Sequence, residues 1–242
     1  KKPQTIGDCS AVVTGIILAF NLPASIPLWI AVVGAFVAIV VTKQLFGGLG
    51  MNFANPALVG RIALFIGFAA RMTNYTPPEG ALDGMASATP LALAKTQSGI
   101  AMLKDLLLGT HPGMLGETCA VALILGGIYL IATKTISPAI PVSYLATVAV
   151  MCVLLGQDVV LHLLSGGLLL GAFFMATDYV TSPFTLKGKI VFGIGLGIIT
   201  CAIRFYGNMN EGVSFAILLM NLVVPYINDL TRQKPLGGAN AK

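Results

Sequence analysis

Residues 27–46 read PLWIAVVGAFVAIVVTKQLF and form a long apolar segment. Its first charged residue is Lys43, near its end. A helix needs about 20 apolar residues to cross the hydrocarbon core of a bilayer. The stretch therefore predicts a membrane-spanning helix from Pro27 to Phe46.

Similar stretches recur along the chain and predict eight spans in all. The other seven run over Ser10–Leu22, Pro56–Ala70, Thr118–Thr133, Ile140–Leu155, Val159–Ala176, Ile190–Ile203 and Val213–Ile227. Several are short for a straight span, and polar, glycine-containing stretches lie beside or inside them at 47–56, 165–167 and 206–212. These stretches are either ordinary loops at the membrane interface or breaks in helices that line a binding site at mid-membrane.

The composition supports this class of protein and excludes others. Of the 242 residues, 56% are apolar and only 10% are charged, against roughly a quarter charged in an ordinary soluble domain. So few charges cannot cover the surface of a soluble enzyme, and 14 scattered cations do not form a nucleic-acid-binding patch. The chain is therefore predicted to be an all-α, polytopic membrane protein without a nucleic-acid partner.

The distribution of lysine and arginine predicts the orientation, because these residues are enriched in cytoplasmic loops. With the N-terminal segment inside, alternation through eight spans places nine cations inside and four outside. Both ends of the chain are then cytoplasmic, and the long loop 71–117 lies outside. The chain divides into spans at 1–70, this loop, further spans at 118–228 and a cytoplasmic tail at 229–242.

An internal repeat is predicted from weak similarity at an offset of 157 residues, which pairs Asn21 with Asp178. The paired positions fall in two three-span blocks, 10–70 and 159–227, which would have opposite orientations. Either the similarity is a chance likeness between apolar segments, or the protein has two inverted five-helix halves. In the second case ten spans are expected, two of them before Lys1.

The outer loop contains a run of small residues, DGMASAT at 83–89, followed by a proline. On spacing alone, Thr89 supplies a hydroxyl in a turn before that proline. The run also resembles the flavinylation motif D-x-x-[ST]-[GS]-A-T, in which the phosphate of FMN is joined to the threonine hydroxyl. Ala86 stands where the motif has Ser or Thr, which bears on the efficiency of attachment and not on its site.

The stretches 6–15, 18–23, 46–57 and 177–183 carry the same resemblance across nearly the whole chain. They resemble the NqrB/RnfD family, and within it the RnfD subunits of the Rnf ion-translocating electron-transport complex. The resemblance implies ten spans in two inverted halves and a covalent FMN on Thr89. A noncovalent riboflavin is a second cofactor that it makes plausible.

The resemblance also implies roles for the residues around Thr89. Asp83 would help a separate flavin transferase to recognise the acceptor. Ser87 and Ala88 are small and would leave room for the nucleotide. Arg71, beside the loop, would either contact the FMN phosphate or anchor the end of its span at the membrane interface.

Polar residues in or near the spans are candidates for an ion path or a second flavin site, because such residues are costly there. Asn21 and Asp178 either coordinate an ion or cap a broken helix. Asn52 and Asn55 either offer groups to Na⁺ or a flavin, or satisfy the local backbone. Arg61 lies inside a span and either extends to the interface or faces the flavin or ion path.

Other cofactor classes lack support in the sequence. His111 and His162 are isolated, and the four cysteines are not spaced like iron–sulfur ligands, so no metal site is predicted. No glycine-rich phosphate loop indicates NAD or ATP binding, and no catalytic residue is assigned to this chain.

The resemblance implies a membrane subunit of an ion-translocating ferredoxin:NAD⁺ oxidoreductase in the bacterial cytoplasmic (inner) membrane. Electrons would pass through FMN, coupled to the export of Na⁺ or H⁺, and the subunit would not be catalytically complete alone. Its partners would be other membrane and peripheral subunits and, during maturation, the flavin transferase.

The spans alone fit a transporter or channel without redox function equally well, and a structural scaffold remains a third class. The run at 83–89 discriminates between them.

Overall fold

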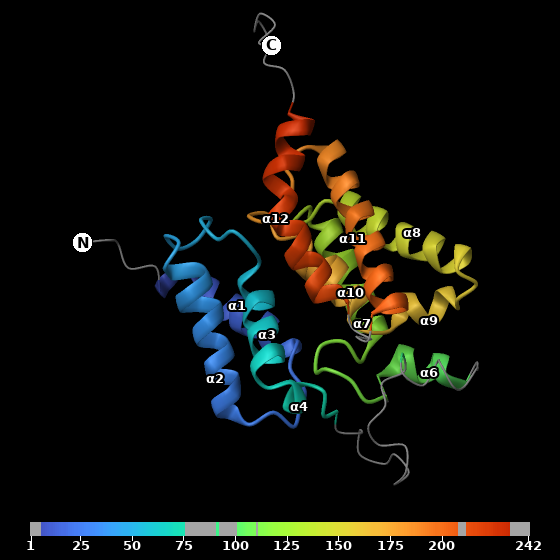
Figure 1. Ribbon diagram of the computed structural model, residues 1–242, viewed down its shortest axis with the longest axis horizontal. Helices are drawn as coiled ribbons and strands as arrows, with labels where there is room; N and C mark the ends of the chain where they lie inside the picture. The colour runs from blue at the N-terminus through green and yellow to red at the C-terminus, as the bar shows by residue number, and fades with distance from the viewer. Residues whose placement is uncertain (1–5, 76–90, 92–100, 110, 208–211, 233–242) are drawn as a thin grey trace, which may run out of the picture.

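The computed structural model describes residues 6–75, 91, 101–109, 111–207 and 212–232. Helices make up the regular structure of these residues, and their one β-type contact is an isolated bridge between Pro23 and Met114. The all-α prediction is confirmed for this part of the chain. Figure 1 shows the helices in two groups, blue to cyan and green to red.

The first group contains a short 3₁₀ turn, η1 (Ile6–Asp8), and four α-helices. These are α1 (Ser10–Phe20), α2 (Leu28–Phe36), α3 (Pro56–Gly67) and α4 (Ala69–Met72). The π-helical segment η2 (Val37–Gln44) continues α2. Helix α3 packs against α1, α2 and η2, so it is the central helix of this group.

The second group contains most of the remaining helices. Its elements are α6 (Ala101–Leu108), α7 (Ala120–Ala132), α8 (Ala139–Leu154), α9 (Val159–Leu164), α10 (Leu168–Leu170), the π-helical η3 (Gly171–Met175), α11 (Leu186–Tyr206) and α12 (Val213–Thr231). Helix α12 also contacts α3, so the two groups meet along this pair. Helix α6 lies in the predicted outer loop, where no helix was expected. Its Leu106 is buried.

Each of the eight predicted spans contains helix, but the lengths differ. Helices α11 and α12 are long and apolar enough to cross a membrane, and the other apolar helices are shorter. Helix α11 begins at Leu186 rather than the predicted Ile190, because the Thr185 side chain accepts a hydrogen bond from the Gly188 N–H and caps it. The number of spans and the inverted repeat stay predictions.

The predicted interruption of the span Val159–Ala176 is confirmed. The helix ends at Leu164 and resumes at Leu168, and the intervening Gly166 and Gly167 have φ angles of 67° and 65°. The buried Arg204 of α11 donates to the carbonyl oxygens of His162 (2.6 Å), Ser165 (2.9 Å) and Gly166 (3.1 Å). A cation thus satisfies carbonyls that the break leaves without helical partners.

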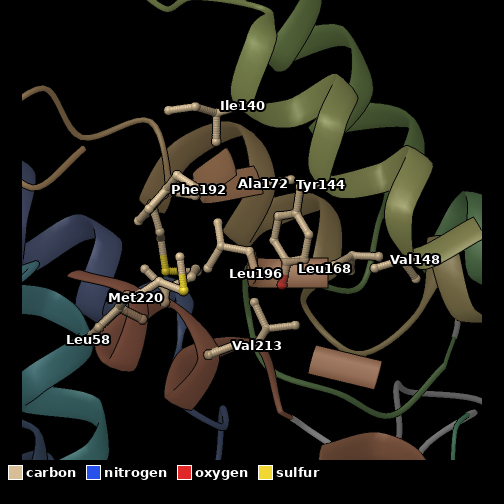
Figure 2. Close-up of a cluster of buried hydrophobic side chains, with 14 of the residues drawn as sticks. Leu58, Ile140, Tyr144, Val148, Leu168, Ala172, Phe192, Leu196, Val213 and Met220 are labelled. Carbon is tan, nitrogen blue, oxygen red and sulfur yellow. The ribbon is translucent and has the colours of Figure 1, made fainter. Parts of the chain in front are cut away.

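The largest hydrophobic cluster lies in the second group and reaches α3 (Figure 2). Figure 2 shows Leu58 of α3 and Met220 of α12 at one side of it, with Tyr144 and Val148 of α8 toward the other. The Tyr144 hydroxyl is buried and lies 2.6 Å from the Thr200 hydroxyl. Because Leu58 belongs to this cluster, burial of apolar surface helps to join the two groups.

Small residues allow α8 and α11 to pack closely. Gly193 and Gly197 stand four residues apart on α11, opposite Ser143 and Thr147, which have the same spacing on α8. A Cβ atom at Gly197 would lie 2.6 Å from Cγ2 of Thr147, and one at Gly193 would meet the Ser143 hydroxyl. This is the small-residue packing that membrane helices use to bring their backbones together.

We expect Gly197→Ala to destabilise the protein by about 1–3 kcal/mol, because the added methyl group overpacks the α8–α11 contact. The matched control is Gly15→Ala in α1, where an added Cβ meets nothing within 4 Å. This control should be neutral or slightly stabilising, because alanine favours a helix interior over glycine. Thermal unfolding in detergent measures both, and equal unfolding temperatures for the two variants would contradict the packing.

Candidate functional site

A cavity of about 910 Å³ lies where the two groups of helices face each other. One side is formed by α1 and the segment 49–57, and the other by α7, η3 and the segment 177–180. Most of the lining is apolar, including Phe173 and Phe174 of η3. The volume falls within the range of about 300–1,000 Å³ that is usual for small-molecule sites.

Five charged or amide-bearing side chains on this cavity form what we call the polar wall: Asp8, Lys43, Asn52, Asn55 and Asp178. Three of them, Asn52, Asn55 and Asp178, were predicted as ion-path or second-flavin residues from the sequence. The tertiary structure thus brings together residues that are up to 126 positions apart, from Asn52 to Asp178.

Asn55 is placed by the start of α3. Its side-chain oxygen accepts hydrogen bonds from the N–H groups of Ala57 (3.1 Å) and Leu58 (3.4 Å), while Pro56 occupies the first helical turn. Its side-chain nitrogen donates to the carbonyl of Met175 at 3.3 Å. Asn55 therefore caps α3 and holds the end of η3, which agrees with its predicted role of satisfying the local backbone. It also lines the cavity.

Asn221 of α12 supports the same region and was not predicted. Oriented with its amide nitrogen toward the carbonyl groups, it donates to Thr181 (3.2 Å) and Ile217 (3.3 Å), and its oxygen accepts from the Asn55 N–H (3.1 Å). The signal in the sequence was an asparagine inside an otherwise apolar predicted span. Asn55 and Asn221 together hold the segment 175–181 against the two groups of helices.

Asp178 follows η3 in the connection to α11. Its carboxylate accepts hydrogen bonds from the Val180 N–H (3.3 Å) and the Thr181 hydroxyl (3.1 Å), within the turn that precedes α11. Burial raises the pKa of this carboxyl above its ordinary value, against the opposing effects of these two hydrogen bonds and of the Lys43 cation. Asp178 thus stabilises the turn at 178–181 and also faces the cavity, whereas ion coordination and the capping of a broken helix stay predictions.

Asn21, the fourth predicted residue, lies beside the cavity rather than in its lining. Its amide donates to the Ile17 carbonyl (2.7 Å) and contacts Sδ of Met175 (3.5 Å), and its oxygen accepts from Arg61 (2.8 Å). Arg61 also donates to the Ser214 hydroxyl at 2.7 Å. Arg61 is only 5% exposed, so extension to the membrane interface is the wrong interpretation. It instead connects α1, α3 and α12.

Lys43 was counted from the sequence only as a cytoplasmic cation. It is 4% exposed and faces the cavity from η2. The signal that could have identified it is its place inside the stretch 27–46, where a charge is costly and is therefore often functional.

The predicted flavin residues Asp83, Ser87, Ala88 and Thr89 lie outside the described residues. Arg71 is exposed in α4, at the start of the predicted outer loop. Its two predicted roles, contact with the FMN phosphate and anchoring at the interface, stay predictions.

Known proteins resemble this chain over nearly all of its length. A family model described as the NQR2, RnfD, RnfE family matches residues 1–237. The chain is 49% identical to a subunit of the Na⁺-translocating ferredoxin:NAD⁺ oxidoreductase complex of Acetobacterium woodii, over 100% of this chain and 77% of the relative. It is 41% identical to a subunit of the proton-translocating ferredoxin:NAD⁺ oxidoreductase complex of Clostridium ljungdahlii, over 98% of this chain and 77% of the relative. Identity to a subunit of the ion-translocating oxidoreductase complex of Stutzerimonas stutzeri is 39%, over 95% of this chain and 76% of the relative.

The raised pKa of Asp178 predicts a specific pH dependence of stability. An unfolded Asp ionises near pH 4, whereas the folded protein holds this proton to higher pH. The stability contributed by the protonated carboxyl is therefore complete below about pH 4 and is lost as the pH rises through the folded pKa. Asp178→Asn keeps an acceptor oxygen but cannot ionise, so the wild type should lose stability relative to this variant over that interval.

Unfolding temperatures in detergent between pH 4 and pH 8 measure this difference. Asp229→Asn, at an exposed carboxylate near the end of α12, is the matched control. A difference between wild type and Asp178→Asn that is constant with pH, or that changes in the other direction, would contradict the burial of this carboxyl.

Proposed function

The chain belongs to the NQR2, RnfD, RnfE family, and from this membership we propose that it is the RnfD subunit of an ion-translocating ferredoxin:NAD⁺ oxidoreductase complex. The observation that carries the proposal is that the similarity to subunits of such complexes extends over the whole chain. The protein works in a bacterial cytoplasmic membrane together with other membrane and peripheral subunits. The coupling ion is Na⁺ or H⁺, since relatives named for each are similar to this chain.

Within the complex, the chain carries electrons by way of FMN joined to Thr89. The motif at 83–89 supports this proposal, as do the small Ser87 and Ala88 beside the acceptor hydroxyl. Asp83 serves recognition by the flavin transferase, and the predicted orientation places the loop on the outer side. The flavin ring supplies the redox chemistry, whereas the chain supplies position and electrostatic surroundings.

A bilayer core of about 30 Å is too thick for one cofactor to bridge, and the cavity fits a second, noncovalent flavin. Its volume and aromatic side chains suit a flat ring, and the amides of Asn52 and Asn55 lie on its polar wall. Riboflavin suits this lining, because it is uncharged and its ring carries both hydrogen-bond donors and acceptors. In this role Phe173 and Phe174 exclude water, and the polar wall orients the ring.

The attachment of FMN is tested on protein produced together with its flavin transferase. The denatured band should fluoresce as flavin under ultraviolet light, and peptides that cover residues 78–95 should carry the mass of FMN. Thr89→Ala should abolish both signals, because it removes the only oxygen to which the phosphate is joined. Thr96→Ala, which removes a hydroxyl of the same predicted outer loop outside the motif, should keep both. A wild-type peptide without added mass would favour a transporter or a scaffold instead.

The cavity is tested with a variant that fills it. Ala122→Trp places an indole on a lining position of α7, and Val121→Trp places the same group on the neighbouring residue, which does not line the cavity. Ala122→Trp should lower acid-released riboflavin at least tenfold and leave covalent FMN unchanged, whereas Val121→Trp should change neither. Equal riboflavin contents in the two variants would place the second flavin elsewhere.

A further inference from the structure

Lys43 is an enclosed cation on the cavity, and the described residues offer it no direct partner. It is 4% exposed and lines the cavity, and in the part of the chain that the structure describes its ammonium makes no hydrogen bond or ion pair. Its electrostatic interactions are with Asp8 and Asp178, the two carboxylates of the polar wall. Because the side chain is enclosed and lines the cavity, a ligand there with negative charge or strong acceptors could gain a charge-assisted hydrogen bond from the ammonium.

The backbone holds Lys43 in this position. The buried residues Ile30, Gly34, Ala38 and Thr42 recur every four residues along α2 and η2, next to Lys43. Such a row drifts one way around an α-helix of 3.6 residues per turn and the other way around the wider turns of a π-helix, so the change from α2 to η2 offsets the drift. The Thr42 hydroxyl donates to the Val37 carbonyl at 3.1 Å. These residues are five positions apart, which is the hydrogen-bond spacing of a π-helix. The π-helical segment therefore keeps both Thr42 and Lys43 on the inner face.

The two carboxylates nearby do not use the donors of Lys43. Asp8 accepts from the Ser10 N–H at 2.8 Å, and Asp178 accepts from Val180 and Thr181. Each carboxylate has its own donors within its own segment. Since no described residue accepts from the Lys43 ammonium, its three N–H donors can serve a group in the cavity.

We propose that Lys43 stabilises the reduced, negatively charged form of a flavin in this cavity relative to the oxidised, neutral form, and so raises its reduction potential. This inference rests on the proposed function, which places riboflavin there. The alternative, a phosphate-bearing ligand, fits less well, because one lysine and no arginine line the cavity among the described residues. The lining is otherwise largely apolar and aromatic, as a flavin ring requires.

The proposed step is the transfer of one electron. A reduced one-electron carrier of the complex, supplied ultimately by ferredoxin, loses one electron, and the flavin gains it together with a negative charge. Lys43 keeps its three protons, forms no covalent bond, and interacts with that charge at short range. When the electron passes to the next carrier toward NAD⁺, the flavin returns to its neutral form. Lys43 is thus a positioning residue that sets a potential, not a group that reacts.

The test uses the intact, purified complex with Lys43→Met, which keeps the length of the side chain and removes the charge. The cavity flavin is the redox signal that is present in the wild type and absent from Ala122→Trp. We expect Lys43→Met to weaken the preference for the reduced form at least tenfold, which is a fall of about 59 mV in the one-electron potential. Lys43→Arg should stay near the wild type. At a pH at which Asp178 is ionised, Asp178→Asn should shift the potential upward, because it removes a negative charge from the same wall.

Three results are distinguishable. If the wild type releases no riboflavin that depends on the cavity, the proposed function of the cavity fails, and this inference fails with it. If riboflavin is present but Lys43→Met leaves its potential unchanged, the flavin assignment stands and the role of Lys43 is overturned. If Lys43→Met and Asp178→Asn shift the potential in the same direction, the shifts report a structural disturbance and the electrostatic role is likewise overturned. Acid-released riboflavin is measured for every variant, so loss of the ligand is not mistaken for a change of potential.

Discussion

The arrangement of the two groups of helices depends on a buried arginine. Arg61 of α3 donates to Asn21 at the end of α1 and to Ser214 at the start of α12. A guanidinium among apolar helices must keep acceptors around it, because an unpaired charge there is far more costly than a paired one. Arg61 therefore fixes the mutual placement of three helices that belong to different parts of the chain, and the cavity lies beside this junction.

Irregular backbone surrounds this junction, and polar side chains satisfy it. The break between α9 and α10 is held by Arg204, and the end of η3 is held by Asn55. Asn221 connects the Asn55 backbone to the Thr181 carbonyl. Non-helical backbone at membrane depth is tolerated only where protein or a cavity satisfies it. Of these residues, Asn55 also belongs to the polar wall of the cavity, and so does Asp178, which binds backbone and side-chain donors of its own segment.

Lys43 and Arg61 show where the reasoning from the sequence succeeded and where it stopped. Both stand in apolar stretches, and the cost of a buried charge identified Arg61 as a candidate. Its position near a span end left two interpretations, the membrane interface and the flavin or ion path, whereas its contacts with Asn21 and Ser214 show that it connects three helices. Lys43 was counted as a loop cation, because its place near the end of the stretch 27–46 suggested an exposed boundary. The π-helical turn that directs it inward has no clear signature in hydropathy.

The sequence by itself determined the helical class, the approximate places of the apolar helices, the break at Ser165–Gly167 and the resemblance of residues 83–89 to a flavin attachment motif. These features depend on local composition and spacing, which determine whether a segment can be buried as a helix. The tertiary structure alone decided that Lys43, Asn52, Asn55 and Asp178 face one cavity, and that Asn21 is paired with Arg61 instead. Those contacts join residues far apart in the chain, and hydropathy carries no information about which polar group on one helix meets which on another.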